Sequence, residues 1–229
     1  TADESVAVVA AYAAAHPERV LGLHFFNPAP VMRLVEVVAT PAVDPAVVDR
    51  ATERMTAWGK TPVRCADSPG FIVNRVNRPF TIEALRMLEA GEAGCHSIDV
   101  AMREAGFPMG PFELMDLVGI DVNLATARGV WEGLGRPDRL RPSPIQEELV
   151  AGGHLGRKTG RGFYLYDDAG RALGPAHVLV PREPGQAARM TATAIAERLR
   201  EALDAEARLP VAAGVATPSD IELALKLGA

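Results

Sequence analysis

The pattern of apolar and polar positions changes once along the chain, from runs typical of strands to spacing typical of helices. Val20–Phe26, Leu34–Ala39 and Thr61–Cys65 are short runs rich in β-branched residues, and the proline-rich turn 27–30 separates the first two. Such runs predict three strands. An Asp-Pro pair opens a helix over 44–58, because Asp caps a helix and Pro suits its first turn. Three strands bury too little surface to be stable alone, so we expect them to pack on the helices that follow or on another chain.

Helical spacing begins after the third predicted strand. Apolar residues three and four positions apart predict helices over 71–89, 97–103 and 111–127. Ser97 is expected to cap the second of these helices, because its hydroxyl can accept a hydrogen bond from a backbone amide of the first turn. The stretch 167–186 is rich in glycine, proline and charge and predicts a linker.

A weak internal repeat relates the middle of the chain to its end. Gly91–Met102 aligns with Gly214–Leu225 at an offset of 123 residues, and the helix expected over 191–207 parallels residues 75–89. Few residues are identical between the two segments, but apolar residues occur at the same positions. Two unrelated capped amphipathic helices would also look alike, so that alternative stays open. We favour a partial second copy of the helical domain, whose exposed apolar faces predict a helical dimer interface.

His24 and Glu36 are the first candidates for chemistry. The imidazole lies at the end of one predicted strand and the carboxylate lies on the next, twelve residues apart. Histidine is the side chain whose proton moves most easily near neutral pH, and a carboxylate behind it fixes the tautomer and stabilises the imidazolium. The pair suggests an acid/base catalyst, while a satisfied core histidine is the alternative that the spacing alone leaves open.

Four ordered sequence blocks carry a resemblance to a known family. Residues 22–37 read Gly-Leu-His-Phe-Phe-Asn-Pro-Ala-Pro-Val-Met-Arg-Leu-Val-Glu-Val. The other blocks are Asp-Ser-Pro-Gly-Phe-Ile-Val-Asn-Arg at 67–75, Phe-Pro-Met-Gly-Pro-Phe-Glu-Leu at 107–114 with Val-Gly-Ile-Asp at 118–121, and Gly-Arg-Lys-Thr-Gly-Arg-Gly-Phe-Tyr at 156–164. The chain resembles the 3-hydroxyacyl-CoA dehydrogenases, the NAD-dependent enzymes of β-oxidation, and their 3-hydroxybutyryl-CoA relatives.

The resemblance implies a role for five residues. His24 would take the proton of the substrate's 3-hydroxyl while hydride leaves for the nicotinamide, and Glu36 would orient His24. Asn74 would bind near the reacting oxygen, although an asparagine at a helix entry can also simply bond to backbone. Asn27 would touch the substrate. Lys158 would approach the cofactor phosphates as a point charge, with an ordinary solvated lysine as the alternative.

The same resemblance implies a fold and its division into domains. The expected fold is an α/β remnant of a Rossmann domain followed by a mainly α-helical domain of the type found at the C-terminus of 6-phosphogluconate dehydrogenase, with a partial second helical copy. We expect the C-terminal part of a Rossmann NAD-binding domain over 1–67 and a helical substrate and dimerisation domain over 68–166. A linker over 167–186 and a partial second helical domain over 187–229 would follow.

Two departures from the family pattern bear on activity. The family usually carries Thr-Ser-Ser-Leu ahead of the histidine strand, and its first serine contacts the substrate oxygen. Here that place falls on Ala2, or on Asp3, so we expect the hydroxyl contact to be missing. The Gly-x-Gly-x-x-Gly turn that holds the pyrophosphate of NAD does not occur in the sequence. We therefore expect most of the NAD site to be absent and the chain to be a truncated form, inactive alone.

Composition narrows the range of partners. The 229 residues carry a net charge of -5 and a pI near 5.6, which argues against nucleic acid because phosphate binding needs a basic face. The apolar run near the start is too short to span a bilayer and no signal peptide opens the chain, so no membrane partner and a cytoplasmic location are expected. Cys65 and Cys95 have no paired spacing and suggest reduced thiols. The five histidines show no metal-site spacing, so no metal is expected.

The expected function is the NAD-dependent oxidation of a 3-hydroxyacyl-CoA to a 3-oxoacyl-CoA, as in fatty-acid β-oxidation or butanoate-type metabolism. The oxidoreductase would form a homodimer through its helical domain. A non-catalytic helical dimerisation module is one alternative. A dehydrogenase of free hydroxyacids is another, but those typically read His-Pro-x-Asn-Pro where residues 24–28 read His-Phe-Phe-Asn-Pro.

Overall fold

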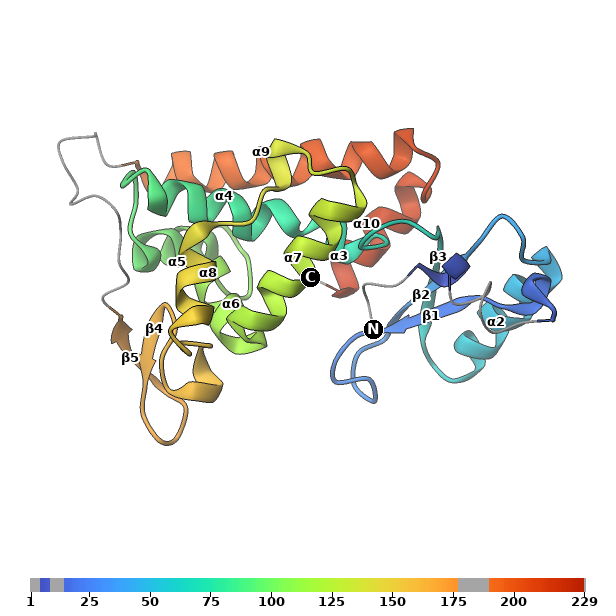
Figure 1. The fold of residues 1–229 in the computed structure, drawn as a ribbon, viewed down its shortest axis with the longest axis horizontal. Coiled ribbons are helices and arrows are strands. Elements are labelled where there is room, and N and C mark those ends of the chain that lie inside the picture. Colours follow the sequence, from blue (N-terminus) through green and yellow to red (C-terminus); the bar gives the residue numbers. More distant parts are fainter. Residues whose placement is uncertain (1–4, 9–14, 177–189, 229) are drawn as a thin grey trace. The chain divides into compact units, whose positions relative to one another are not determined.

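The computed structural model of the chain describes residues 5–8, 15–176 and 190–228 (Figure 1). The strands β1 to β3 lie before residue 67, and most of the helices follow them. This confirms the predicted order of an α/β part and a helical part. Ala2 and Asp3, the candidates for the serine position, lie outside the described residues. Within the described ranges, no helix combines the length and the apolar character needed to cross a membrane.

The chain folds into two compact units. The first unit combines Thr1–Asn77 with Ala205–Ala229, and the second is Arg78–Asp204. Helix α9 (Ala192–Ala212) contributes residues to both units. The domain ranges expected from the sequence stay predictions.

A three-stranded sheet forms the centre of the first unit. Its strands are β1 (Gly22–Phe25), β2 (Leu34–Ala39) and β3 (Thr61–Ala66), which confirms the three predicted strands. β2 lies in the middle, antiparallel to β1 and parallel to β3. Because it has a neighbour on each side and helices on both faces, every residue of β2 except its last is buried.

Helix α2 (Pro45–Ala57) covers one face of this sheet. It begins as predicted: the Asp44 carboxylate accepts a hydrogen bond from the amide of Ala46 at 2.9 Å, and proline occupies the first turn. Val37 of β2 packs on this face with Val43 and Val48. The short 3₁₀ turn η1 precedes the sheet at Pro17–Arg19.

The opposite face of the sheet is covered by α3 (Val73–Val76) and α10 (Pro218–Gly228). Side chains of a strand alternate between faces, so the even-numbered residues of β2 point to these two helices. Leu34 and Val38 join a buried cluster there with residues of α3 and α10. The expectation that the strands lean on helices that follow them is thus confirmed, and the last described helix of the chain supplies much of that support.

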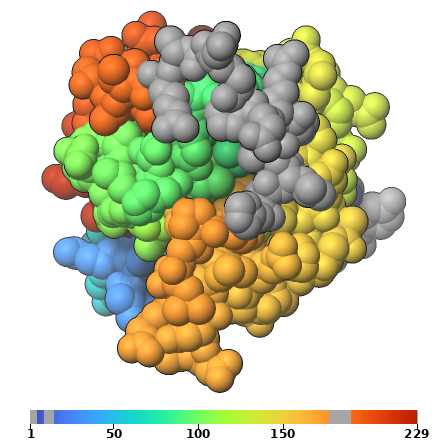
Figure 2. Space-filling model, turned by 90° about the vertical axis from the view of Figure 1, so that its left-hand side faces the viewer, coloured from blue at the N-terminus to red at the C-terminus, as the bar shows by residue number. Residues whose placement is uncertain are grey.

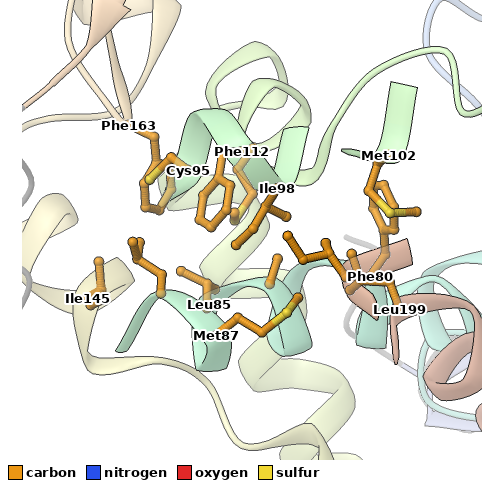
Figure 3. Packing of buried hydrophobic residues seen from close by; sticks show 14 of the residues in the cluster. Phe80, Leu85, Met87, Cys95, Ile98, Met102, Phe112, Ile145, Phe163 and Leu199 are labelled. Carbon is orange, nitrogen blue, oxygen red and sulfur yellow. The ribbon is translucent and has the colours of Figure 1, made fainter. Parts of the chain in front are cut away.

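Helices build the second unit, and the larger of its apolar clusters is drawn in Figure 3. Phe112 and Phe163 meet edge to face in this core, with ring centroids 4.8 Å apart. Phe80 of the first helix packs against the same cluster. The elements in order are α4 (Arg78–Glu89), α5 (Cys95–Glu104), α6 (Pro111–Val118), α7 (Ile120–Gly133), η2 (Asp138–Leu140), α8 (Pro144–Ala151), η3 (Arg157–Thr159), β4 (Tyr164–Tyr166) and β5 (Ala172–Pro175), followed by the start of α9.

A short antiparallel hairpin of β4 and β5 lies at the surface of the second unit, in orange in Figure 2. β4 packs against the η3 turn, and the Arg157 guanidinium lies over the Tyr166 ring, 5.7 Å from its centroid. β5 falls inside the predicted linker 167–186, so part of that stretch is a strand. Residues 177–186 of the predicted linker lie outside the described residues.

Three helical predictions need correction. The single helix predicted over 71–89 is two helices, because Pro79 has no backbone N–H with which to continue the hydrogen bonds of α3. The helix predicted over 111–127 is interrupted at Gly119, whose φ of 103° is outside the helical region. Ser97 does not cap α5: the helix begins two residues earlier, after Gly94, and Ser97 lies within its first turn.

The two segments of the sequence repeat have matching backbone hydrogen bonds. The amide of Gly91 donates to the carbonyl of Leu88, and that of Gly214 donates to Val211, with φ angles of 68° and 67° at the two glycines. Further along, the Ile98 amide donates to Gly94 as the Ile221 amide donates to Thr217, and all these pairs differ by the same 123 positions. The same turn therefore connects α4 to α5 and α9 to α10.

Two ion pairs follow the same repeat. Arg75 pairs with Glu206 at 3.2 Å in the first unit, and Arg198 pairs with Glu83 at 3.2 Å in the second. Each arginine and each glutamate is 123 positions from its counterpart. The first pair is buried, with side chains 6% and 1% exposed, whereas the second is partly open to solvent.

Candidate active site

His24 and Glu36 face each other across the first two strands. They are direct partners in the antiparallel register of β1 and β2, so their side chains emerge on the same face of the sheet. His24 Nδ1 lies 2.6 Å from Glu36 Oε2. The sequence prediction that the imidazole and the carboxylate meet is confirmed as a contact.

The second oxygen of Glu36 is held by the backbone. Glu36 Oε1 accepts hydrogen bonds from the amides of Ile72 at 3.0 Å and Val73 at 2.9 Å. The side chain is fully buried, and a buried carboxylate needs such partners to remain ionised. Glu36 therefore has one oxygen fixed to the start of α3 and the other free to hold the histidine.

This arrangement selects the tautomer of His24. An ionised carboxylate has no proton to donate, so His24 Nδ1 carries the proton of the short contact. In the neutral ring Nε2 is then an acceptor. The ring keeps 21% of its side-chain surface exposed, so the pair has the composition and the orientation of a general base supported by a carboxylate.

Two phenylalanine rings flank the imidazole. The Phe26 ring meets it edge to face, with centroids 4.7 Å apart, and the Phe71 ring lies 5.6 Å away at a tilt of 55°. Phe71 is buried and Phe26 is partly buried. Apolar walls on two sides restrict the ring and strengthen its electrostatic interaction with Glu36.

The other predicted site residues of the first unit lie nearby along the chain. Asn74 follows Val73 on α3, the short helix whose amides hold Glu36, and its side chain is partly buried. Asn27 comes two residues after the end of β1 and is exposed, with a cis bond to Pro28. Their roles toward a substrate stay predictions.

Lys158 lies in the second unit and already has a partner. Its ammonium is 2.6 Å and 2.8 Å from the two carboxylate oxygens of Asp121 and holds the pKa of that carboxyl below its usual value. Gly119 leaves room for this pair, since a Cβ atom there would lie 2.9 Å from Lys158 Nζ. The proposed contact of Lys158 with a cofactor phosphate stays a prediction.

The second unit contains a buried polar network that could be mistaken for a catalytic site. Asp99 accepts hydrogen bonds from the amides of Phe112 and Glu113 and from the Tyr164 hydroxyl, and burial raises its pKa to about 7. Asp116 accepts bonds from the amides of residues 163 and 164. Because most of these partners are backbone amides of α6 and β4, the network joins elements together and leaves no carboxylate free for substrate.

The two cysteines and the acidic side chains offer no further reactive centre in the parts of the chain that the structure describes. Burial raises the pKa of the Cys65 thiol strongly and that of the Cys95 thiol to about 12, so both are protonated at neutral pH. No group of three or more metal-ligating side chains occurs among the described residues.

Sequence reasoning missed the groups that hold the pair in place. It identified His24 and Glu36 but not the amides of Ile72 and Val73, since any residue has a backbone amide and no side-chain pattern marks those that bond a carboxylate. It also missed Phe71 as the second wall of the imidazole, although the residue stood within the quoted block 67–75.

Two family models match consecutive parts of the chain. The model described as the NAD binding domain of 3-hydroxyacyl-CoA dehydrogenase matches residues 5–68. The model described as the C-terminal domain of 3-hydroxyacyl-CoA dehydrogenase matches residues 70–166. The chain belongs to the 3-hydroxyacyl-CoA dehydrogenase family. The histidine, the glutamate and α3 all fall within the two matched regions.

Individual members of the 3-hydroxyacyl-CoA dehydrogenase family are similar to the chain. The 3-hydroxyadipyl-CoA dehydrogenase of Escherichia coli K12 is 55% identical over 150 residues, which are 65% of this chain and 32% of that protein. A crystal structure of 3-hydroxybutyryl-CoA dehydrogenase from E. coli K12 matches with a TM-score of 0.70 and 52% identity over 72% of this chain and 35% of that one.

A third similarity extends over the whole chain. The crystal structure of the dehydrogenase part of multifunctional enzyme 1 from Caenorhabditis elegans matches with a TM-score of 0.68 and 25% identity, covering 100% of this chain and 52% of that one. The match therefore takes in α9 and α10 as well as the sheet. The chain spans between about a third and about half of the length of these relatives.

Proposed function

We propose that the protein oxidises a 3-hydroxyacyl-CoA to the 3-oxoacyl-CoA with NAD and that His24 is the general base. The observation that carries the proposal is the 2.6 Å contact between His24 Nδ1 and Glu36 Oε2, with Glu36 Oε1 fixed by two backbone amides. Membership of the 3-hydroxyacyl-CoA dehydrogenase family supports the reaction class.

In this proposal the chain's own residues handle the proton. The unprotonated Nε2 of His24 accepts the proton of the substrate's 3-hydroxyl as the C3–H bond gives up its hydride. The imidazolium that forms is stabilised by Glu36, whose charge faces the protonated Nδ1 in a buried setting. Asn74 hydrogen-bonds the reacting oxygen, and Asn27 contacts the substrate beyond it.

NAD would be the hydride acceptor, and the residues of this chain account for only part of an NAD-binding site. The family match to an NAD binding domain covers residues 5–68. The sequence has no Gly-x-Gly-x-x-Gly turn of the kind that cradles a pyrophosphate. These residues therefore account for proton transfer and not for cofactor binding, apart from the proposed phosphate contact of Lys158.

The finer parts of the proposal concern assembly and location. We place the protein in the cytoplasm, acting in β-oxidation or a related acyl-CoA pathway, as a homodimer formed through its helical domain. The exposed side chains of Leu117, Val118 and Val122 in the second unit are consistent with such an interface. Sedimentation of the purified protein would test the assembly: a monomer at micromolar concentration contradicts it.

The test of the activity uses two histidine variants of the protein. His24→Gln removes the proposed base and should lower kcat about 100-fold to 10,000-fold with a 3-hydroxyacyl-CoA and NAD. His16→Gln is the matched control, because His16 also pairs with a glutamate, Glu18 at 3.0 Å, but on the surface. The control should keep its turnover. Normal turnover in His24→Gln, or no reaction of the unaltered protein with any 3-hydroxyacyl-CoA, refutes the proposed function.

A further inference from the structure

Helix α10 packs directly behind the candidate active site. It belongs to the segment that repeats the first helical region, so nothing in the family motifs gives it a part in the reaction. Ile221 and Ala224 of this helix are buried in the same cluster as Leu34, Phe71 and Val73. The residues of that cluster on the sheet and on α3 are neighbours of the His24–Glu36 pair.

Gly228 is the point of closest approach. A Cβ atom built at Gly228 would lie 2.5 Å from Leu34 Cδ2, 3.1 Å from Val73 Cγ2 and 3.5 Å from Phe26 Cε1. The first distance is too short for any side chain to be accepted without movement. The side chains of Leu34, Val73 and Phe26 therefore occupy the space that a larger residue at 228 would need.

Each of the three contacted residues bears on the catalytic pair in a different way. Phe26 lies edge to face on the His24 ring, at 4.7 Å between centroids. The amide of Val73 donates to Glu36 Oε1 at 2.9 Å. Leu34 lies two residues before Glu36 on β2, on the same face of the strand. A shift of α10 would thus be transmitted to the imidazole and to the carboxylate together.

The need for glycine at this position is steric. Gly228 is the last residue of α10 and its φ is not in the left-handed region, so its backbone conformation is open to any residue. Glycine is also a poor helix former. Close approach to Leu34, Val73 and Phe26 is the remaining physical reason for a residue without a side chain here.

We infer that α10 is a positioning element of the His24–Glu36 pair and that Gly228 is the residue through which it acts. The expected change of kcat rests on the proposed function. The expected change of the His24 resonances does not depend on it. Gly228 touches neither substrate nor cofactor in this account. It acts by setting where Phe26, Leu34 and Val73 lie.

The experiment compares two substitutions on the same helix. Gly228→Val places a branched side chain against Leu34, whereas Lys226→Val places the same side chain at an exposed position of α10. For both variants we would measure folding by circular dichroism, the pH dependence of kcat and of KM, and the ¹⁵N resonances of the His24 ring through a pH titration.

We expect Gly228→Val to lower kcat by about tenfold to a hundredfold with little change of KM, because small displacements of a catalytic group have effects of this size. Its His24 resonances and the pH profile should move. Lys226→Val should resemble the unaltered protein in all three respects. Adding Leu34→Ala to Gly228→Val removes the atom that the new side chain meets most closely and should return the His24 resonances toward their original positions.

Two results overturn the inference. One is a folded Gly228→Val variant whose His24 resonances and pH profile are unchanged. The other is an equal effect of Gly228→Val and Lys226→Val. Absence of dehydrogenase activity in the unaltered protein would contradict the proposed function instead, and the His24 resonances would still decide whether α10 positions the ring.

Discussion

His24 and Glu36 occupy directly opposed positions of β1 and β2, and their side chains meet at 2.6 Å between Nδ1 and Oε2. The carboxylate is anchored by the amides of Ile72 and Val73 on its other oxygen. Glu36 therefore orients His24 and is itself fixed by two backbone amides. This chain of contacts runs from the sheet through the carboxylate to α3 and requires no other side chain.

Replacing Glu36 by glutamine should reverse the tautomer of His24. The glutamine has one carbonyl oxygen, which the two amides of α3 would engage, so its NH₂ group would face Nδ1 and donate to it. The proton of the imidazole would then move to Nε2 and block the base. We expect kcat to fall about 100-fold or more while the fold is retained. Turnover measurements with Glu18→Gln as the surface control check this, and a pH profile unaltered by Glu36→Gln would contradict it.

Two glycines with the same backbone conformation should respond differently to alanine. Gly110 caps α6 with φ −80° and ψ 165°, and Gly94 caps α5 with φ −84° and ψ 159°. A Cβ at Gly110 would lie 2.2 Å from Asp99 Oδ1 and 2.3 Å from Asp99 Cα, whereas nothing lies within 4 Å of one at Gly94. We expect Gly110→Ala to lower the free energy of unfolding by roughly 1–3 kcal/mol or more and Gly94→Ala to change it by less than about 1 kcal/mol. Equal effects in urea unfolding would show that Asp99 does not pack as described.

The raised pKa of Asp99 predicts a dependence of stability on pH. The folded protein keeps a proton on Asp99 up to about pH 7, whereas the unfolded chain releases it near 3.8. The stability from this proton is complete below about pH 4 and is lost as the pH rises to about 7, by roughly 1–4 kcal/mol. Unfolding free energies in urea at pH 5 and pH 8 measure the loss. Asp99→Asn, which cannot titrate, should reduce this difference, and an identical difference in both proteins would exclude Asp99 as its source.

The two repeat-related ion pairs should contribute unequally to stability. Glu206→Gln removes the negative charge that faces the buried guanidinium of Arg75 and should lower the free energy of unfolding by about 3–5 kcal/mol. Glu83→Gln leaves Arg198, which is 36% exposed, still paired with Glu92 at 2.7 Å, and should cost about 1 kcal/mol or less. Urea unfolding of the two variants at the same pH makes the comparison. Equal losses of unfolding free energy would contradict the stronger dependence of Arg75 on its glutamate.

The sequence predicts the strands and the pairing of His24 with Glu36 because these depend on local information. β-branched runs and a proline-rich turn specify adjacent strands, and a spacing of twelve residues across that turn brings the two side chains to one face. The start of α2 at Asp44 and Pro45 is equally local. Each of these features depends on residues that lie within about fifteen positions of one another.

The remaining features of the site depend on contacts that no local pattern contains. The amides that hold Glu36 come from residues 72 and 73, and the helix that covers them is α10, about 150 residues further on. Breaks at Asn77 and Gly119 were missed because the apolar spacing continues through them, and only Pro79 and the φ of Gly119 interrupt the helix. The start of α5 was misjudged because Ser97 is a good cap in isolation.

The role of His24 is tested most directly by the ¹⁵N NMR spectrum of its ring at neutral pH. We expect Nδ1 to carry the proton, with a strongly deshielded proton signal from its bond to Glu36, and Nε2 to be unprotonated. Glu36→Gln should remove that signal. A ring protonated at Nε2 and free at Nδ1 would contradict the assignment of His24 as a base held by Glu36.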